Sequence, residues 1–570
     1  MRMAGWCVTA ALAAVSLAAQ QVEVIGPGGR MDSPGARGGA EIPPGDYATL
    51  EGTVVDAVTG APLGKASVQV MGMSAGRNEP AGAATDSGGR FVIDRVAPGR
   101  YRLQAVRNRY STQRYGEDSP AGSGATLVVE KGQHLKNLDF KLTPAGAITG
   151  RVVDEDGEPA PYVQVMLMRY RYLDGRRMLS SAGARPGETN DLGEYRIFGV
   201  TPGKYYVAAS FRSRRPFAGS GSGSDEEESA YPALYYPGVQ DPSQTVPIEV
   251  RAGEERSGID FQLRQARAVS IEGTVSRADG GPLPAGVVVN LMPRGSGFGF
   301  PGGRHGQMAD PRTGRFKMTG VLPGSYVLFA MTGRRDERLY ARLPLEVGGS
   351  DIKGAELALS PSLFVRGKMR FEEDAPSGTS LAGASVMLRA SEVFPGSRAG
   401  RVEEDGSFEI EAAPGEYVFR VSGLPAGAYL KSARIGDRDA LEQGLLLPGG
   451  APSAIEAVVS LKAGRVSGVV RDGQDQPASG AEVVLIPEES QRLREDLFKV
   501  TTTDQYGGFA IEGVTPGKYH VVALDEVEGG AYRDPAIVEA LVEEAEKVEV
   551  EESGQAVLEL ELRALPEPGG

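Results

Sequence analysis

Hydrophobic and polar residues alternate in short runs along most of the chain, which is the pattern of half-buried β-strands. The clearest runs begin at a tyrosine after Pro-Gly, and every second residue is then apolar, as in Tyr205, Val207 and Ala209. The residues between them vary in character, so one face of each strand is predicted to face a core. Helical periodicity is scarce, and the best helix is predicted from Asp534 as N-cap, over residues 534–548.

The phrase Pro-Gly-x-Tyr occurs five times. The five copies begin at Pro98, Pro202, Pro323, Pro414 and Pro516, with spacings of 104, 121, 91 and 102 residues. A period near 100 residues predicts five tandem domains rather than a solenoid of short repeats. The predicted domains are 48–144, 145–265, 266–361, 362–463 and 464–563, followed by a tail at 564–570.

Two further phrases precede each Pro-Gly-x-Tyr. The first is a glycine that leads an alternating strand, at Gly52, Gly150, Gly273, Gly367 and Gly468. The second is a turn followed by an aromatic residue, in DSGGRF, DLGEY, PRTGRF, EDGSF and DQYGGF. Asp or Asn with Gly favours hairpin turns, and Pro-Gly favours a tight turn before a strand. The repeated residues are therefore predicted to be turn and core positions of an antiparallel β-sandwich with about seven strands.

Composition supports a folded, turn-rich chain with an export signal. Gly (79 residues) and Pro (38) make up about a fifth of the 570 residues. Arg2 precedes an apolar run over 7–19, which is typical of a secretory signal peptide and too short to span a bilayer as a helix. We expect a signal peptide at 1–19, with an uncleaved anchor as the alternative, and a disordered Gly/Pro-rich segment at 20–47. The predicted location is secreted, periplasmic or on the cell surface.

Cysteine content and charge narrow the possible partners. Cys7 is the only cysteine and lies in the predicted signal, so the exported chain forms no disulfide. The net charge of −14 argues against nucleic acid or anionic lipid as partners. The acidic stretch 525–553 lacks the spacing of a calcium loop and is interpreted as a solvated helix and loop.

The first repeat, with its Gly-led strand, its G-x-P-L-G-x-A-x-V hairpin between Gly60 and Val68, and its Pro-Gly-x-Tyr, resembles the carboxypeptidase regulatory-like domain. This is a transthyretin-like (prealbumin-like, Ig-like) sandwich related to the Cna B-type repeats of bacterial surface adhesins. The second and fifth repeats resemble it too, whereas the third and fourth are divergent. The resemblance covers about 48–563 and implies an all-β tandem array. Its motifs are turn and core positions, which specify fold more than function.

The sequence argues against catalysis despite the family name. A zinc carboxypeptidase needs a His-x-x-Glu pair and a distant histidine. The three histidines, His134, His305 and His520, lie in three different repeats, and none has a glutamate at the third following position. No enzyme activity, catalytic residue, cofactor or metal site is therefore predicted.

Two aromatic loops are weak candidates for ligand binding. Tyr231, Tyr235 and Tyr236 lie in YPALYYPG, and Phe298 and Phe300 lie in GFGFPGG. Exposed rings there would stack on sugars, or the rings cap their own sandwich. Any function is expected in the loops after the tyrosine strand, where the five copies differ.

The predicted function is a non-catalytic scaffold, adhesion or protein-interaction protein of the bacterial envelope or exterior. One alternative is a polysaccharide-binding protein with starch-binding-like modules (a carbohydrate-binding-like fold), and another is an accessory subunit of a separate hydrolase or peptidase. The expected partners are proteins or polysaccharides of the envelope or extracellular space. Connectors of about four residues limit bending and predict a monomeric, semi-rigid, extended array.

Overall fold

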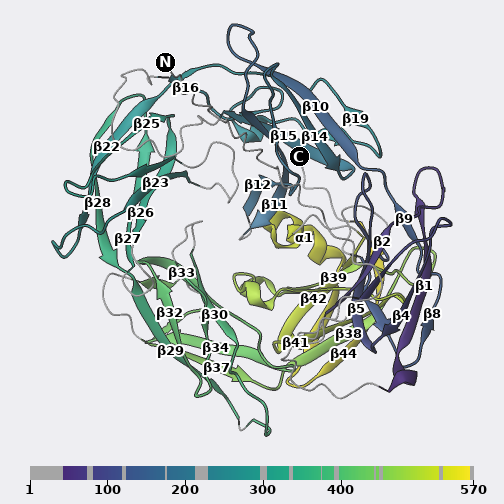
Figure 1. Ribbon diagram of the computed structural model, residues 1–570. Coiled ribbons are helices and arrows are strands. Elements are labelled where there is room, and N and C mark those ends of the chain that lie inside the picture. Colours follow the sequence, from purple (N-terminus) through teal and green to yellow (C-terminus); the bar gives the residue numbers. More distant parts are fainter. Residues whose placement is uncertain are drawn as a thin grey trace, which may run out of the picture. The chain divides into compact units, whose positions relative to one another are not determined.

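Figure 1 shows the computed structural model of the chain. It describes residues 43–564 except 74–80, 118–123, 174–175, 212–228, 295–304, 333–337, 374, 391–396, 442–444, 448–453 and 526–529. The predicted signal peptide, most of the segment 20–47, and Phe298 and Phe300 lie outside the described residues. Within them the structure is almost entirely β, with one α-helix, α1 (Pro535–Glu544). The prediction of an all-β chain is confirmed.

Sandwich 1 comprises strands β1–β9 and sandwich 2 comprises β10–β21. The strands of sandwich 1 are β1 (Ala48–Asp56), β2 (Ser67–Gly72), β3 (Ala81–Ala84), β4 (Arg90–Val96), β5 (Gly99–Val106), β6 (Gln113–Arg114), β7 (Leu127–Val129), β8 (His134–Leu135) and β9 (Phe140–Leu142). Those of sandwich 2 are β10 (Gly146–Val153), β11 (Val163–Leu173), β12 (Arg176–Ser181), β13 (Gly187–Glu188), β14 (Glu194–Val200), β15 (Gly203–Phe211), β16 (Ser229–Ala230), β17 (Leu234–Tyr235), β18 (Ile248–Val250), β19 (Glu255–Arg256), β20 (Phe261–Gln262) and β21 (Ala266–Arg267).

Sandwiches 3 and 4 comprise β22–β28 and β29–β37. The strands of sandwich 3 are β22 (Val269–Arg277), β23 (Val288–Pro293), β24 (His305–Met308), β25 (Arg315–Val321), β26 (Gly324–Thr332), β27 (Leu339–Val347) and β28 (Ile352–Pro361). Those of sandwich 4 are β29 (Leu363–Phe371), β30 (Ser385–Ala390), β31 (Gly400–Arg401), β32 (Ser407–Ala412), β33 (Gly415–Ser422), β34 (Tyr429–Ile435), β35 (Arg438–Asp439), β36 (Leu445–Leu447) and β37 (Ile455–Ser460).

Sandwich 5 comprises β38–β44 and carries the helix α1. Its strands are β38 (Gly464–Arg471), β39 (Glu482–Pro487), β40 (Lys499–Thr502), β41 (Gly508–Val514), β42 (Gly517–Leu524), β43 (Glu546–Val550) and β44 (Gln555–Arg563). Within the part of the chain that the structure describes, each sandwich has a hydrophobic core made only of its own residues. A separate core for each repeat is what a tandem array of self-sufficient domains requires.

Strand pairing departs from a purely antiparallel sandwich in the same way in every copy. The first strand pairs in parallel with the last strand of the domain core, in β1·β9, β10·β20, β22·β28, β29·β37 and β38·β44. The same first strand pairs antiparallel with the strand that carries the turn aromatic, as β1 does with β4. Alternating polarity reports which face of a strand is buried but not its direction, so this pairing was not predictable from the pattern.

The repeated glycine and the repeated aromatic residue are cross-strand partners. The five pairs are Gly52–Phe91, Gly150–Tyr195, Gly273–Phe316, Gly367–Phe408 and Gly468–Phe509. A Cβ on these glycines would lie only 1.8–2.6 Å from a carbonyl oxygen of the segment that forms or leads into the last strand. Those oxygens belong to Leu138, Ile259, Ala355, Ile455 and Leu558. Only glycine fits between the last strand and the aromatic ring.

The tyrosine of Pro-Gly-x-Tyr ties its own turn. Its hydroxyl donates to the carbonyl oxygen four residues earlier, over 2.6–3.0 Å, in all five copies. The donors are Tyr101, Tyr205, Tyr326, Tyr417 and Tyr519. In four copies the ring lies 3.2–3.6 Å from where a Cβ on the glycine of the phrase would be, so the ring packs directly over that glycine. The phrase is therefore a single packing unit of turn and strand.

We predict that Gly468→Ala destabilises sandwich 5 by about 3 kcal/mol, because the added methyl would lie 1.8 Å from the Leu558 oxygen and force β38 and β44 apart. Hydrogen exchange measured by mass spectrometry should show faster exchange in peptides of both strands. Gly473→Ala is the matched control, since nothing lies within 4 Å of the place that its added methyl would take. Equal protection in the two variants would contradict the packing argument.

Alkaline pH should destabilise the sandwiches through the tying tyrosines. Burial raises the pKa of Tyr205, Tyr326 and Tyr519, and raises the pKa of Tyr417 to about 12. Unfolded phenols ionise from about pH 10, whereas the folded ones stay neutral, so the unfolded state gains as pH rises from about 10 to 12. The melting temperature, followed by circular dichroism, should be insensitive to these groups below pH 10 and fall above it.

A matched pair of variants separates these phenols from other alkaline effects. Tyr417→Phe removes one buried phenol and should reduce the fall above pH 10, at a cost of about 1 kcal/mol at pH 8 from the lost hydrogen bond. Tyr506→Phe changes a ring that is 59% exposed and should leave both properties unaltered. An identical alkaline fall in both variants would rule out the tying tyrosine as a contributor.

Candidate functional site

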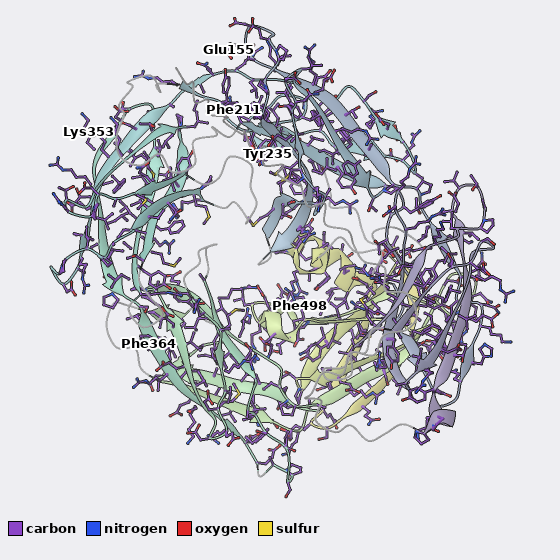
Figure 2. The ribbon with its side chains drawn as sticks, in the orientation of Figure 1. Glu155, Phe211, Tyr235, Lys353, Phe364 and Phe498 are labelled. Atoms are coloured by element: carbon purple, nitrogen blue, oxygen red, sulfur yellow. The ribbon has the colours of Figure 1, made fainter. Side chains whose placement is uncertain are left out.

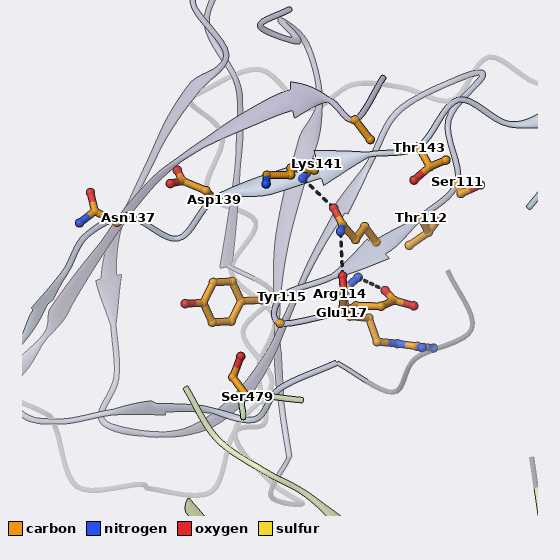
Figure 3. A pocket seen from close by; sticks show the side chains of 13 residues that line it. Ser111, Thr112, Arg114, Tyr115, Glu117, Asn137, Asp139, Lys141, Thr143 and Ser479 are labelled. Carbon is orange, nitrogen blue, oxygen red and sulfur yellow. Dashed lines mark hydrogen bonds between the residues drawn. The ribbon is translucent and has the colours of Figure 1, made fainter. Parts of the chain in front are cut away.

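The candidate site is a cavity of about 410 Å³ on sandwich 1, shown in Figure 3. Its walls are β6 with the turn that follows, the start of β9, and one residue of sandwich 5. The lining residues are Ala57, Ser111, Thr112, Gln113, Arg114, Tyr115, Gly116, Glu117, Asn137, Asp139, Lys141, Thr143 and Ser479. The volume lies in the range of roughly 300–1,000 Å³ that small-molecule sites occupy.

A glutamine carboxamide holds the walls of the cavity together. Gln113 Nε2 donates to the carbonyl oxygen of Glu117 over 3.0 Å, and its Oε1 accepts from the Lys141 backbone N–H over 2.9 Å. The Arg114 backbone N–H also donates to Glu117 Oε2 over 2.5 Å. These bonds, drawn in Figure 3, fix β6, its turn and β9 against one another. The side chains that line the cavity therefore project from a braced frame.

The cavity carries groups of both charges beside one aromatic ring. Asp139 Oδ1 accepts from the Thr53 N–H (3.0 Å) and hydroxyl (2.6 Å), which holds the carboxylate in place. Lys141 and Asn137 are exposed beside it. Burial and the charge of Asp139 raise the pKa of Tyr115, so its phenol remains a neutral hydrogen-bonding group at physiological pH. Hydroxyl, amide and balanced charged groups around a ring suit a polar, uncharged ligand better than an ion.

Sandwich 1 is joined to sandwich 5 beside this cavity. Thr126 N–H donates to the Thr503 oxygen over 3.2 Å, and the hydroxyls of Thr126 and Thr502 lie 3.3 Å apart. Gln505 Oε1 accepts from the Val128 N–H (3.1 Å), while its Nε2 donates to the Val128 oxygen (3.0 Å). We call these contacts the clasp. An extended array was expected from the short connectors, whereas these bonds join the first sandwich to the fifth. Connector length carries no information on contacts between distant repeats.

Sandwich 5 also contacts sandwiches 4 and 2. Arg389 Nη2 lies 2.8 Å from both carboxylate oxygens of Glu495, and Arg420 lies 3.4 Å from the same carboxylate. Burial lowers the pKa of the Arg420 guanidinium, and the charge of Glu495 opposes that shift. On the outer face of sandwich 5, Tyr172 of sandwich 2 joins an apolar cluster with residues of β39, β42 and α1. The fifth sandwich therefore holds three others.

The predicted helix is present as α1 but ends at Glu544, and residues 546–548 belong to β43 instead. One face of α1 is buried. Asp534 caps it by accepting from the Ala536 N–H over 2.9 Å. Ile537, Val538 and Leu541 are buried in the cluster that includes Tyr172. The interpretation of this stretch as a solvated helix therefore holds for its acidic face only.

The tyrosine loop predicted as a sugar platform packs largely onto its own sandwich. Tyr235, labelled in Figure 2, is 1% exposed and packs with Met168 and Leu179. The Tyr231 ring lies 5.4 Å from that of Phe211, and its hydroxyl donates to Glu155 Oε2 over 2.9 Å. Both Tyr231 and Tyr236 are partly buried, and Tyr236 lies 6.3 Å from the Phe261 ring. Tyr235 thus offers no face to a ligand, and the cavity of sandwich 1 replaces this loop as the better candidate.

Sequence reasoning did not single out the cavity residues. They are ordinary polar residues without a motif, and only their position after the tyrosine strand of the first repeat marked the region. In the described part of the chain no group of three or more His, Cys, Asp or Glu is placed to hold a metal ion. No helix of that part is long and apolar enough to cross a membrane.

Two stretches of the chain match a known domain family. The fold is that of multidomain β-sandwich proteins. Residues 49–143 and 465–561 match the family model of the carboxypeptidase regulatory-like domain, which confirms the predicted resemblance for sandwiches 1 and 5. These two stretches are similar to the carboxypeptidase regulatory-like domain, and the family model matches no other part of the chain. None of the curated proteins compared with it matches.

Matches among solved structures include two pilin proteins and one further bacterial protein. The minor pilin GBS52 of Streptococcus agalactiae is 13% identical, with 39% of this chain and 96% of that chain covered and a TM-score of 0.22. The major pilin subunit BcpA of Bacillus cereus is 12% identical, with 55% and 100% covered and a TM-score of 0.14. The Bacillus anthracis TIE protein is 12% identical, with 69% and 68% covered and a TM-score of 0.14. At these scores, function rests on this chain's own residues.

We predict that Tyr235→Ala destabilises sandwich 2 by about 3 kcal/mol, because it leaves a cavity among Met168, Leu179 and their neighbours. Hydrogen exchange should accelerate in peptides from β11 and β15. Tyr231→Ala, which removes a partly buried ring, should have a clearly smaller effect. Wild-type exchange in Tyr235→Ala would mean that this ring is free to serve a ligand.

Proposed function

We propose that the chain is an exported, non-catalytic scaffold of the bacterial envelope or exterior, acting by adhesion or protein interaction. This proposal rests on one observation: the residues that recur in all five copies have structural roles. In all five copies the glycine leaves room for the neighbouring strand, the aromatic ring packs opposite it, and the tyrosine hydroxyl closes a turn. The repeated residues therefore specify the same fold five times. We expect binding in the loops and at the junctions between sandwiches.

The cavity on sandwich 1 supports a second candidate function, the binding of a polysaccharide. Tyr115 supplies a ring edge and a neutral hydroxyl, while Asn137 and Lys141 supply hydrogen-bond donors around a space large enough for a sugar unit. On this view the scaffold holds a saccharide of the envelope at its first domain. Sandwich 5 contributes Ser479 to the same cavity.

The scaffold proposal predicts retention without turnover. The mature chain, immobilised on beads, should retain an envelope protein or polysaccharide fraction, and the bound material should be recovered with unchanged mass. Release of shortened peptides or glycans would show that the chain is an enzyme. Deleting residues 2–19 should keep the chain inside the producing cell, and export of that deletion variant would contradict the predicted signal.

The polysaccharide proposal predicts a response to changes in the cavity. On an array of bacterial and plant oligosaccharides, Lys141→Ala should weaken binding by about tenfold, which corresponds to a hydrogen bond from a charged donor of about 1.4 kcal/mol. Lys136→Ala is the control, because Lys136 is exposed and does not line the cavity. Equal binding by both variants would exclude this cavity as the sugar site.

A further inference from the structure

The outer edge of β7 is closed by a side chain of another sandwich. In the described residues β7 pairs only with β5, where Arg100 stands opposite Val128, so β7 is an edge strand. An edge strand presents free N–H and C=O groups that attract further strands. Here the N–H and the carbonyl of Val128 both bond to the carboxamide of Gln505.

Gln505 takes the place that a neighbouring strand would fill. A carboxamide offers one acceptor and a donor side by side, as a backbone peptide unit does. The adjacent backbone continues the pattern, since Thr126 bonds to the Thr503 oxygen and forms a parallel bridge with Asp504. The segment 503–505 is thus a short substitute strand on the edge of sandwich 1.

The turn that presents Gln505 is rigid, and its residue is distinctive among the five repeats. Asp504 Oδ1 accepts from the N–H groups of Tyr506 (2.9 Å) and Gly508 (2.8 Å), which locks the turn. The residues at the corresponding turn position of the other repeats carry no carboxamide, being Ser87, Asp191, Pro311 and Glu404. Among the five repeats, a carboxamide stands at this turn position only in the fifth, and it is the turn of the fifth repeat that bonds to the edge of β7.

We propose that the turn Thr502–Gln505 is a docking site for an open β-strand edge, and that its occupant is β7 of the same chain. The clasp has four hydrogen bonds, and no hydrophobic cluster of the described residues spans sandwiches 1 and 5. Domains joined by a small polar interface move relative to one another by default, so we expect the clasp to open reversibly. Opening uncovers the β7 edge for pairing with a strand of a partner, so the clasp controls access to that edge. This inference does not depend on the proposed binding functions.

A disulfide placed in the clasp measures how often it is closed. In the full chain with Cys7→Ser, which removes the only natural cysteine, Thr126→Cys and Thr502→Cys replace two hydroxyls that lie 3.3 Å apart. Mild oxidation at micromolar protein should give a monomer with an intrachain disulfide, seen on a non-reducing gel and by mass. The pair Thr126→Cys and Val557→Cys, with Val557 77% exposed on β44, should not cross-link within the chain.

A fourth substitution tests the role of Gln505. Gln505→Ala removes two of the three hydrogen bonds that the cysteine pair leaves in the clasp and should slow intrachain cross-linking at least fivefold. Tyr506→Ala changes the exposed neighbour in the same turn and should alter the rate less than twofold. Exclusively interchain disulfides would show that the occupant is a second copy, and an unchanged rate in Gln505→Ala would show that the carboxamide does not dock the edge. Either result overturns the proposal.

Discussion

The structure of each sandwich depends on one steric constraint, which is the close approach of the last strand to a glycine of the first strand. The first strand carries a glycine because the last strand passes so close that a carbonyl oxygen occupies the place of a Cβ, 1.8 Å away at Gly468. The aromatic residue opposite the glycine packs against the bare backbone and restores the buried apolar surface that a side chain would have given. This arrangement lets a parallel last strand lie beside the first one and closes the sheet around its core.

Two sets of local hydrogen bonds fix the strands on either side of that glycine: those of the turn before the aromatic residue and that of the tyrosine hydroxyl. The turn before the aromatic is held by a side-chain oxygen that accepts backbone N–H groups, as Asp504 does, and this positions the ring over the glycine. At the far end of the strand that carries the aromatic, the tyrosine hydroxyl secures the next turn. Local bonds thus set the register of three strands within about fifty residues. The remaining surface of each sandwich is free to differ, and the junctions are made there.

Sequence patterns predicted the local structure well because its causes are local. Alternation and Pro-Gly-x-Tyr predicted the strands and their buried faces, and Asp534 followed by Pro535 predicted α1, which spans Pro535–Glu544. The candidate site was harder to predict. The sequence left open whether Tyr235 is a platform or a cap, and the structure buries it against side chains of β11, β12 and β15. Gln505 bonds to a residue 377 positions away, a relation that no local pattern records.

The central claim is that each repeat is a self-sufficient sandwich with its own core. Stretching the mature chain between its ends by single-molecule force spectroscopy tests this most directly. The account predicts five unfolding events, each lengthening the chain by roughly 300–400 Å, as expected for domains of about 95–120 residues. A single event that releases the length of the whole chain would show one shared core and contradict the account.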